Sequence, residues 1–181
     1  MPSPSKNILI TGLPGSGKTT LIQKLADELR EYDLAGFYTE EIRAHGARTG
    51  FRLTSLDRKT TGTLAQVDIR EHRIGKYGVD LPGFEQFLKT LQLLDPRPSL
   101  VMIDEIGKME CLSVKFRNLV ASLLDSPVPV IATIALKAGG FIDEVKRRPD
   151  VRLYELTNRN RDTLLQDIEG LVRSLPCSRE P

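Results

Sequence analysis

The sequence predicts an α/β protein with a mainly parallel sheet that is covered by helices on both faces. Two observations predict this class. Short apolar runs alternate with segments whose apolar residues recur at helical spacing, and a glycine-rich turn lies between the first run and the first such segment. A length of 181 residues suffices for one hydrophobic core and is short for two ordinary domains. We therefore expect one domain over residues 1–181, with right-handed crossovers between parallel strands.

The first unit reads as strand, turn and helix. Residues 7–11 (NILIT) form an apolar run typical of a strand that is buried on both faces, and residues 19–30 place their apolar side chains on one helical face. The sequence pattern then changes: residues 34–67 consist of short runs rich in Val, Thr, Phe and Tyr, with glycines between them. These runs predict the strands of a β-rich insertion over about residues 34–78.

Alternation of helices and strands returns after the insertion. A helix is predicted over residues 81–94, because Pro96 and Pro98 cannot continue it. The elements predicted after it are strands at 99–104, 128–134 and 151–156 and helices at 114–124, 141–148 and 161–175, with a frayed tail at 176–181. Ligands of such sheets bind at the carboxyl ends of strands, so the loops at Gly12, Asp104, Thr133 and Thr157 are expected to converge.

Composition excludes some classes of partner. The 26 Lys and Arg residues nearly balance 24 Asp and Glu, so a formal charge of +2 gives no general case for nucleic acid or a membrane surface. Cys111 and Cys177 are in no metal-ligand spacing and are expected to be reduced thiols. No apolar run resembles a signal peptide or reaches the roughly 20 residues of a membrane span. We expect a soluble, cytoplasmic monomer.

The strongest motif is Gly12-Leu13-Pro14-Gly15-Ser16-Gly17-Lys18-Thr19, which satisfies G-x-x-x-x-G-K-S/T between a strand and a helix. Its glycines allow backbone conformations that are closed to other residues, so that consecutive N–H groups face a phosphate at the helix N-terminus. Lys18 is expected to reach the β and γ phosphates, and the Thr19 hydroxyl to ligate Mg²⁺. The motif predicts a P-loop NTPase with a three-layer sandwich fold.

Two carboxylates, Asp104 and Glu105, end the predicted strand LVMID. Neighbouring residues of a strand point to opposite sides, so the two are not expected to hold one metal ion from equivalent positions. Asp104 is the expected magnesium partner, directly or through water. Glu105 is then free to orient and deprotonate an attacking water, which favours hydrolysis over binding alone.

The blocks GLPGSGKTTL, GFYTEEIRAHGARTGF, IGKYGVD, IDEIGKME, PVIATI and ELTNRNRDTL occur in this order, and together they resemble the small THEP-type nucleoside-triphosphatases from residue 7 to about residue 165. The resemblance implies a RecA-like core and hydrolysis of ATP, GTP, CTP, UTP and TTP to the diphosphate and phosphate. It also implies two nucleotide-binding segments. They comprise Gly12, Leu13, Pro14, Gly15, Ser16, Gly17, Lys18, Thr19 and Thr20, and Leu100, Val101, Met102, Ile103, Asp104, Glu105, Ile106 and Gly107.

Broad base tolerance also has an argument from the residues themselves. The loop after the last predicted strand reads Asn158-Arg159-Asn160-Arg161 and holds no carboxylate to read guanine. Asn160 or Arg161 could contact any base, or Asn160 could cap the last helix. Charge on the transferring phosphoryl group needs a further cation, for which Lys108 or Arg48 is the candidate, so that Lys18, Glu105 and Lys108 form the expected catalytic set.

Two other functions remain open at this point. The same loop and the basic insertion could serve a nucleotide or small-molecule kinase, in which an acceptor replaces water. A nucleotide-gated regulatory switch would hydrolyse slowly until a partner binds. The absence of a stripe of interleaved basic and aromatic residues argues against an RNA partner.

Overall fold

The computed structural model describes residues 5–175, so the expected frayed tail and Cys177 lie outside the described residues. The strands are β1 (Asn7–Thr11), β2 (Leu34–Ala44), β3 (Ala47–Ser55), β4 (Thr61–Gln66), β5 (Arg73–Ile74), β6 (Tyr77–Val79), β7 (Leu100–Ile106), β8 (Val130–Ile134) and β9 (Val151–Glu155). The helices are α1 (Lys18–Glu28), α2 (Leu81–Thr90), α3 (Val114–Asp125), α4 (Gly140–Lys146) and α5 (Arg161–Ser174), with a 3₁₀ turn η1 (Glu110–Leu112). None of the helices within residues 5–175 has the length and apolar character needed to cross a bilayer.

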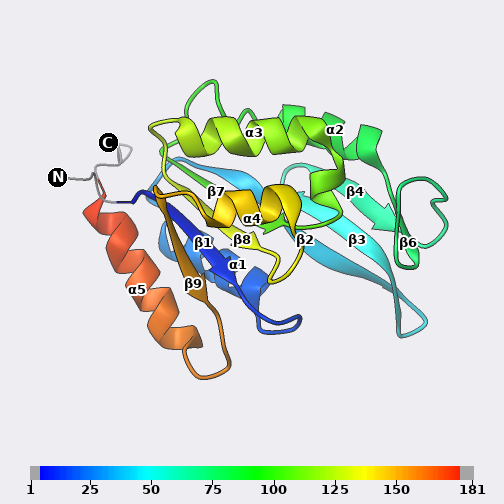
Figure 1. Ribbon diagram of the computed structural model, residues 1–181, viewed down its shortest axis with the longest axis horizontal. Coiled ribbons are helices and arrows are strands. Elements are labelled where there is room, and N and C mark those ends of the chain that lie inside the picture. Colours follow the sequence, from blue (N-terminus) through cyan, green and yellow to red (C-terminus); the bar gives the residue numbers. More distant parts are fainter. Residues whose placement is uncertain (1–4, 176–181) are drawn as a thin grey trace.

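All nine strands form one sheet in the order β5-β6-β4-β3-β2-β7-β8-β1-β9 (Figure 1). The five strands from β2 to β9 in this order pair in parallel, and the remaining pairings, which belong to the predicted insertion, are antiparallel. β2 belongs to both parts. Its first residues pair with β7 in parallel, Leu34 beside Leu100, while its length from Phe37 to Ala44 pairs with β3 as a hairpin.

The period of two along the parallel strands separates two cores. In β1, Ile8 and Ile10 face the core under α1 and α5, whereas Leu9 faces the core under α2, α3 and α4. Figure 1 shows these helices on the two sides of the sheet. The expected helix-sheet-helix sandwich is therefore confirmed. The central strands β1, β7 and β8 are buried because both of their faces are covered, whereas the edge strand β9 is partly exposed.

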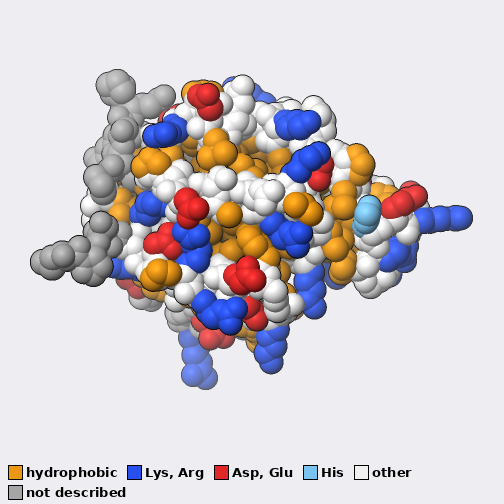
Figure 2. Space-filling model, turned by 45° about the horizontal axis from the view of Figure 1, so that its top comes forward, with side chains coloured by type: hydrophobic (Ala, Val, Ile, Leu, Met, Phe, Trp, Pro, Cys, Tyr) orange, Lys and Arg blue, Asp and Glu red, His pale blue; other side chains and the backbone are white. Residues whose placement is uncertain are grey.

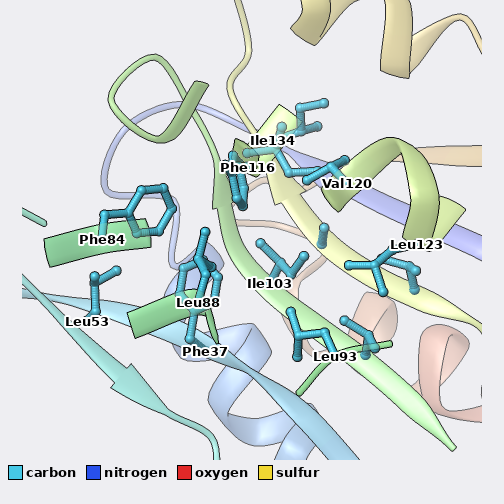
Figure 3. Close-up of a cluster of buried hydrophobic side chains, with 14 of the residues drawn as sticks. Phe37, Leu53, Phe84, Leu88, Leu93, Ile103, Phe116, Val120, Leu123 and Ile134 are labelled. Carbon is cyan, nitrogen blue, oxygen red and sulfur yellow. The ribbon is translucent and has the colours of Figure 1, made fainter. Parts of the chain in front are cut away.

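An aromatic cluster fixes the insertion to the parallel part of the sheet (Figure 3). Phe37 of β2 makes edge-to-face contacts with Phe84 and Phe87 of α2 and with Phe116 of α3, at centroid distances of 6.1, 5.8 and 6.4 Å. Phe37 is also the register partner of Ile103 in β7. The packing thus determines where β2 lies beside the acidic end of β7.

The predicted boundaries of the helix at 81–94 and the strand at 99–104 differ from the structure for identifiable reasons. The helix expected to reach residue 94 ends at Thr90, because the N–H of Leu91 bonds to Leu88 in a tighter turn and Gln92 takes a left-handed φ of 48°. This turn returns Leu93 to the core and leaves Leu94 41% exposed. The strand expected to end at Asp104 continues to Ile106, because Ile106 pairs again with Ile134 after an irregularity.

The surface carries mixed charge on the face drawn in Figure 2. Lys, Arg, Asp and Glu side chains are interspersed there with small apolar patches, also over the insertion at the right of the view. Cys111 is a half-buried free thiol, and burial raises its pKa to about 12. Both findings agree with the composition, which indicated balanced charge and a reduced, unreactive thiol.

Substitution Gly36→Ala is expected to lower the free energy of unfolding by about 3 kcal/mol or more, since a Cβ at Gly36 would stand 1.7 Å from the carbonyl oxygen of Met102 at a φ of +141°. Gly46→Ala is the matched control, because Gly46 also has a positive φ, +79°, but no atom within 4 Å of its added Cβ. The control substitution should lower the free energy of unfolding by about 1–2 kcal/mol. Urea unfolding measures both, and equal losses would contradict the close approach of β2 and β7.

Candidate active site

The glycine-rich loop connects β1 to α1 in a conformation that requires glycine at two positions. Gly15 and Gly17 have φ values of +76° and +97°, and Gly17 is the N-cap residue directly before α1. A Cβ on Gly12 would stand 2.7 Å from the carbonyl oxygen of Leu156, so β1 and the end of β9 approach closely there. The first N–H groups of α1 have no acceptors within the helix, an arrangement that favours an anion at this terminus.

Lys18 lies across this loop. Its Nζ donates hydrogen bonds to the carbonyl oxygens of Gly12, at 3.0 Å, and Leu13, at 3.3 Å. The ammonium group is thus held at the mouth of the loop without a carboxylate in direct contact. A polyphosphate bound by the loop N–H groups would meet this charge.

Asp104 is the centre of the site. It is 1% exposed and accepts hydrogen bonds from the hydroxyl groups of Thr19, at 2.6 Å, Thr133, at 2.6 Å, and Thr39, at 3.3 Å. These threonines come from α1, β8 and β2. Of the strand ends at Gly12, Asp104, Thr133 and Thr157 that were expected to converge, Thr133 bonds directly to Asp104, and Thr157 lines a hollow together with the loop that follows Gly12. Thr39 was missed, because only the pairing of β2 with β7 brings it beside Asp104.

The donor set around Asp104 fits Mg²⁺. This ion prefers oxygen ligands and is usually held by one or two carboxylates together with hydroxyl groups, water and phosphate. The Thr19 hydroxyl and the Asp104 carboxylate supply two such oxygens 2.6 Å apart, at the start of the helix that follows the loop. Within residues 5–175 no group of three His, Cys, Asp or Glu residues forms an all-protein metal cage. The site suits an ion that arrives with a phosphate ligand.

Glu105 and Asp104 differ in their surroundings, whereas the sequence indicated that strand alternation would separate them. The regular alternation of β7 is interrupted, since Ile103 and Ile106 both face the α2–α4 core although they are three residues apart. Strand period therefore does not separate the two carboxylates. Their surroundings do: Asp104 is buried among hydroxyl groups, while Glu105 is partly exposed. Burial and the charge of Asp104 raise the pKa of Glu105, and Lys18 lowers it in part.

Glu110 is a second buried carboxyl group beside Glu105, and sequence reasoning missed it. One oxygen of each glutamate lies within 3.0 Å of the place where a Cβ on Gly107 would stand, so the glycine makes room for both. Burial, and next the charge of Glu105, raise the pKa of Glu110 to about 8. Its position in the sequence, in a polar segment after β7, gave no sign that η1 would turn it inward.

The two candidate cations have different surroundings. Arg48 donates to a carboxylate oxygen of Glu41 and to the Tyr77 hydroxyl, each at 2.8 Å, and its guanidinium lies over the ring of Phe51. Lys108 is exposed on the loop after β7 and lines a hollow together with Glu105. Lys108 is therefore the better placed of the two to approach a phosphate bound at Lys18.

A larger hollow of about 500 Å³ opens beside the N-terminus of α1. Its lining includes Thr20, Arg159, Arg161 and Asp162. Arg161 donates to the carbonyl oxygen of Ser16 at 2.8 Å and thereby joins α5 to the glycine-rich loop. The loop itself holds no carboxylate, but Asp162 in the first turn of α5, directly after the loop, also lines the hollow.

Asn160 does not cap α5 through its side chain, although it precedes the helix. Its Oδ1 accepts from the backbone N–H of Thr157 at 2.8 Å, and its Nδ2 donates to the carbonyl oxygen of Glu155 at 2.9 Å. Asn160 therefore holds the turn between β9 and α5. Of the two proposed base contacts, only Arg161 lines the hollow.

Comparison with protein families matches residues 7–169 to the family described as NTPase. The chain is 44% identical to "Nucleoside-triphosphatase THEP1" of Thermotoga sp. (strain RQ2) over 92% of its own length and 95% of that protein. It is 39% identical to the human "Cancer-related nucleoside-triphosphatase" over 94% and 98% of the two chains.

Two solved structures are also similar. The crystal structure of THEP1 from the hyperthermophile Aquifex aeolicus has a TM-score of 0.82 and 38% identity, with 92% of this chain and 98% of that chain covered. The solution structure of a human cancer-related nucleoside triphosphatase has a TM-score of 0.80 and 37% identity, with 93% and 97% covered. The fold is thus that of a P-loop NTPase, as the sequence predicted.

Replacement of Glu110 by Gln is expected to change stability in a pH-dependent way. Because the pKa of Glu110 rises from an ordinary 4.5 to about 8 on folding, its stabilising contribution is complete at low pH and is lost as pH rises toward 8. The variant lacks this titration, so its free energy of unfolding relative to the parent should increase by roughly 1–4 kcal/mol between pH 5 and pH 8. Thermal or urea unfolding at both pH values measures this; a constant difference would contradict it.

Proposed function

Because this chain belongs to the NTPase family and is a nucleoside-triphosphate phosphohydrolase, we propose that it removes the γ phosphate of nucleoside triphosphates with Mg²⁺ held at Thr19 and Asp104. The observation that carries the proposal is the 2.6 Å hydrogen bond between these two side chains at the start of α1. It brings a hydroxyl and a carboxylate oxygen together next to the anion-binding turn. Such a pair is the protein part of a magnesium-triphosphate site.

The glycine-rich loop binds and orients the triphosphate. Backbone N–H groups from Gly15 to Thr20 receive the phosphate oxygens, and Lys18 exchanges its present carbonyl partners for the β and γ phosphates. Bound Mg²⁺ supplies neutralisation of charge on the β and γ oxygens. Thr39 and Thr133 keep the Asp104 carboxylate oriented through their hydrogen bonds.

Glu105 is the base that we assign to the attacking water. The oxygen of the water forms a bond to the γ phosphorus, the bond from that phosphorus to the bridging oxygen breaks, and the water proton passes to Glu105. A raised pKa makes the Glu105 carboxylate a stronger base than an exposed glutamate. Lys108, from the loop after β7, is placed to neutralise charge on the transferring group.

The hollow between α1 and α5 is our site for the nucleoside. Arg161 presents a planar cation that stacks on any base, which supports use of ATP, GTP, CTP, UTP and TTP. Asp162 lines the same hollow and is the one feature there that could favour guanine. We assign it no part in base selection, since it lies on the first turn of α5 in a largely exposed position.

Glu105→Gln is expected to lower kcat for ATP by about 10²–10⁴-fold with little change in KM, because the amide cannot accept the water proton. Phosphate release with and without Mg²⁺ is the measurement, and omission of Mg²⁺ should reduce the parent to the level of the variant or below. Glu144→Gln, at an exposed glutamate of α4, is the control and should keep parental kcat. Parental turnover in Glu105→Gln would remove this carboxylate as the base.

Asp162→Asn is expected to change the ratio of kcat/KM for GTP to that for ATP by less than about two-fold, because base contacts here do not depend on a carboxylate. Arg161→Ala, in contrast, should raise KM for every triphosphate by a similar factor of about ten, since it removes the stacking cation. Steady-state kinetics with the four ribonucleotides test both variants. A selective loss of GTP use in Asp162→Asn would show that guanine is read at this position.

A further inference from the structure

A second hollow, of about 300 Å³, lies on the other side of the acidic strand end, under the insertion. Its walls come from strands that are far apart in sequence: Phe51 of β3, Leu64 of β4 and Ile74 of β5 face Met109 and Ala135 across it. Thr39, Glu105 and Glu110 supply polar groups at its inner end. The hollow therefore combines an apolar body with one polar end.

We propose that this hollow binds a small alcohol that carries no phosphate group, and that the enzyme transfers the γ-phosphoryl group to that alcohol in competition with water. The inference rests on the proposed triphosphate site, because the polar end of the hollow contains the same Glu105.

The walls indicate an organic ligand rather than water alone. Hydrolysis requires a single ordered water at Glu105 and gains nothing from side chains such as Phe51 and Ile74. A cavity of this volume, with apolar walls and a few polar groups at one end, is typical of a site for a small organic molecule. The insertion thus supplies walls for which the hydrolytic reaction has no use.

The position of Glu105 indicates which group of the ligand reacts. Thr39 lines the hollow, and its hydroxyl donates to the same Asp104 oxygen as the Thr19 hydroxyl at the start of α1, so the polar end of the hollow adjoins the place of the γ phosphate. A hydroxyl bound there stands where the attacking water would stand. Its oxygen forms the new bond to phosphorus, the bond to the bridging oxygen breaks, the nucleoside diphosphate leaves and the hydroxyl proton passes to Glu105.

Charge in the lining argues against a phosphorylated acceptor such as a nucleotide. Lys108 is the only lysine or arginine among the described lining residues, and it stands against two glutamates. Two basic residues of the insertion, Arg43 and Arg48, do not compensate, because both are paired with Glu41. A neutral alcohol avoids the repulsion that a phosphate ester would meet.

The test incubates the full chain with ATP, Mg²⁺ and one of three probe alcohols, namely benzyl alcohol, 2-phenylethanol or 3-pyridylmethanol, and follows products by phosphorus NMR. We expect an alkyl phosphate signal whose ratio to free phosphate rises and saturates with the alcohol concentration. Ala135→Leu fills the hollow and should lower that ratio by about ten-fold. Ile74→Phe serves as a second filling variant in case the first does not fold.

The control variant is Leu153→Gln on the edge strand β9, where the leucine is 45% exposed, and it should leave the product ratio unchanged. Free phosphate as the sole phosphorus product besides ADP, with all three alcohols, would overturn the inference while hydrolysis itself stands. Conversion of AMP to ADP in place of ester formation would also overturn it, because the acceptor would then be a nucleotide. Loss of all turnover in the parent with Mg²⁺ would overturn the proposed function as well.

Discussion

The Asp104 carboxylate connects the elements that form the candidate active site. Asp104 accepts hydrogen bonds from threonines of α1, β2 and β8, so the helix after the glycine-rich loop, the inner end of the insertion and the middle of the parallel sheet share one anchor. A buried carboxylate is costly unless several donors satisfy it, and here three hydroxyl groups do so. The arrangement of the site therefore depends on the correct register of three separate elements.

Local features of the chain were enough to predict most of the fold and to propose the phosphate-binding half of the site. The loop from Gly12 to Thr19 is recognisable because the backbone turn, the helix start and Lys18 are contiguous in the sequence. β1 and β8 are recognisable because they are mostly apolar, as expected of strands that helices cover on both faces. The role of Asp104 could also be predicted from the sequence, because a carboxylate at the end of a buried strand has few structural reasons to be there.

The remaining features depend on contacts between distant residues. Thr39 becomes a partner of Asp104 only through the pairing of β2 with β7, and Glu110 becomes buried only because Gly107 leaves room beside Glu105. The interrupted alternation of side chains in β7 could not be predicted from the sequence either, because nothing in LVMIDEI marks an irregularity. Likewise, α2 ends early because Leu93 finds a place in the core, although the spacing alone continued the helix to Leu94.

The double membership of β2 has a mechanical consequence. The first residues of β2 pair with β7, and its outer residues continue without a break into the hairpin with β3. Between these two parts, Phe37 is held in place by contacts with three aromatic rings. Thr39 lies two residues after Phe37, on the side of the hairpin. The hairpin tip near Gly46 is thereby connected through one continuous strand to the Thr39 hydroxyl that donates to Asp104.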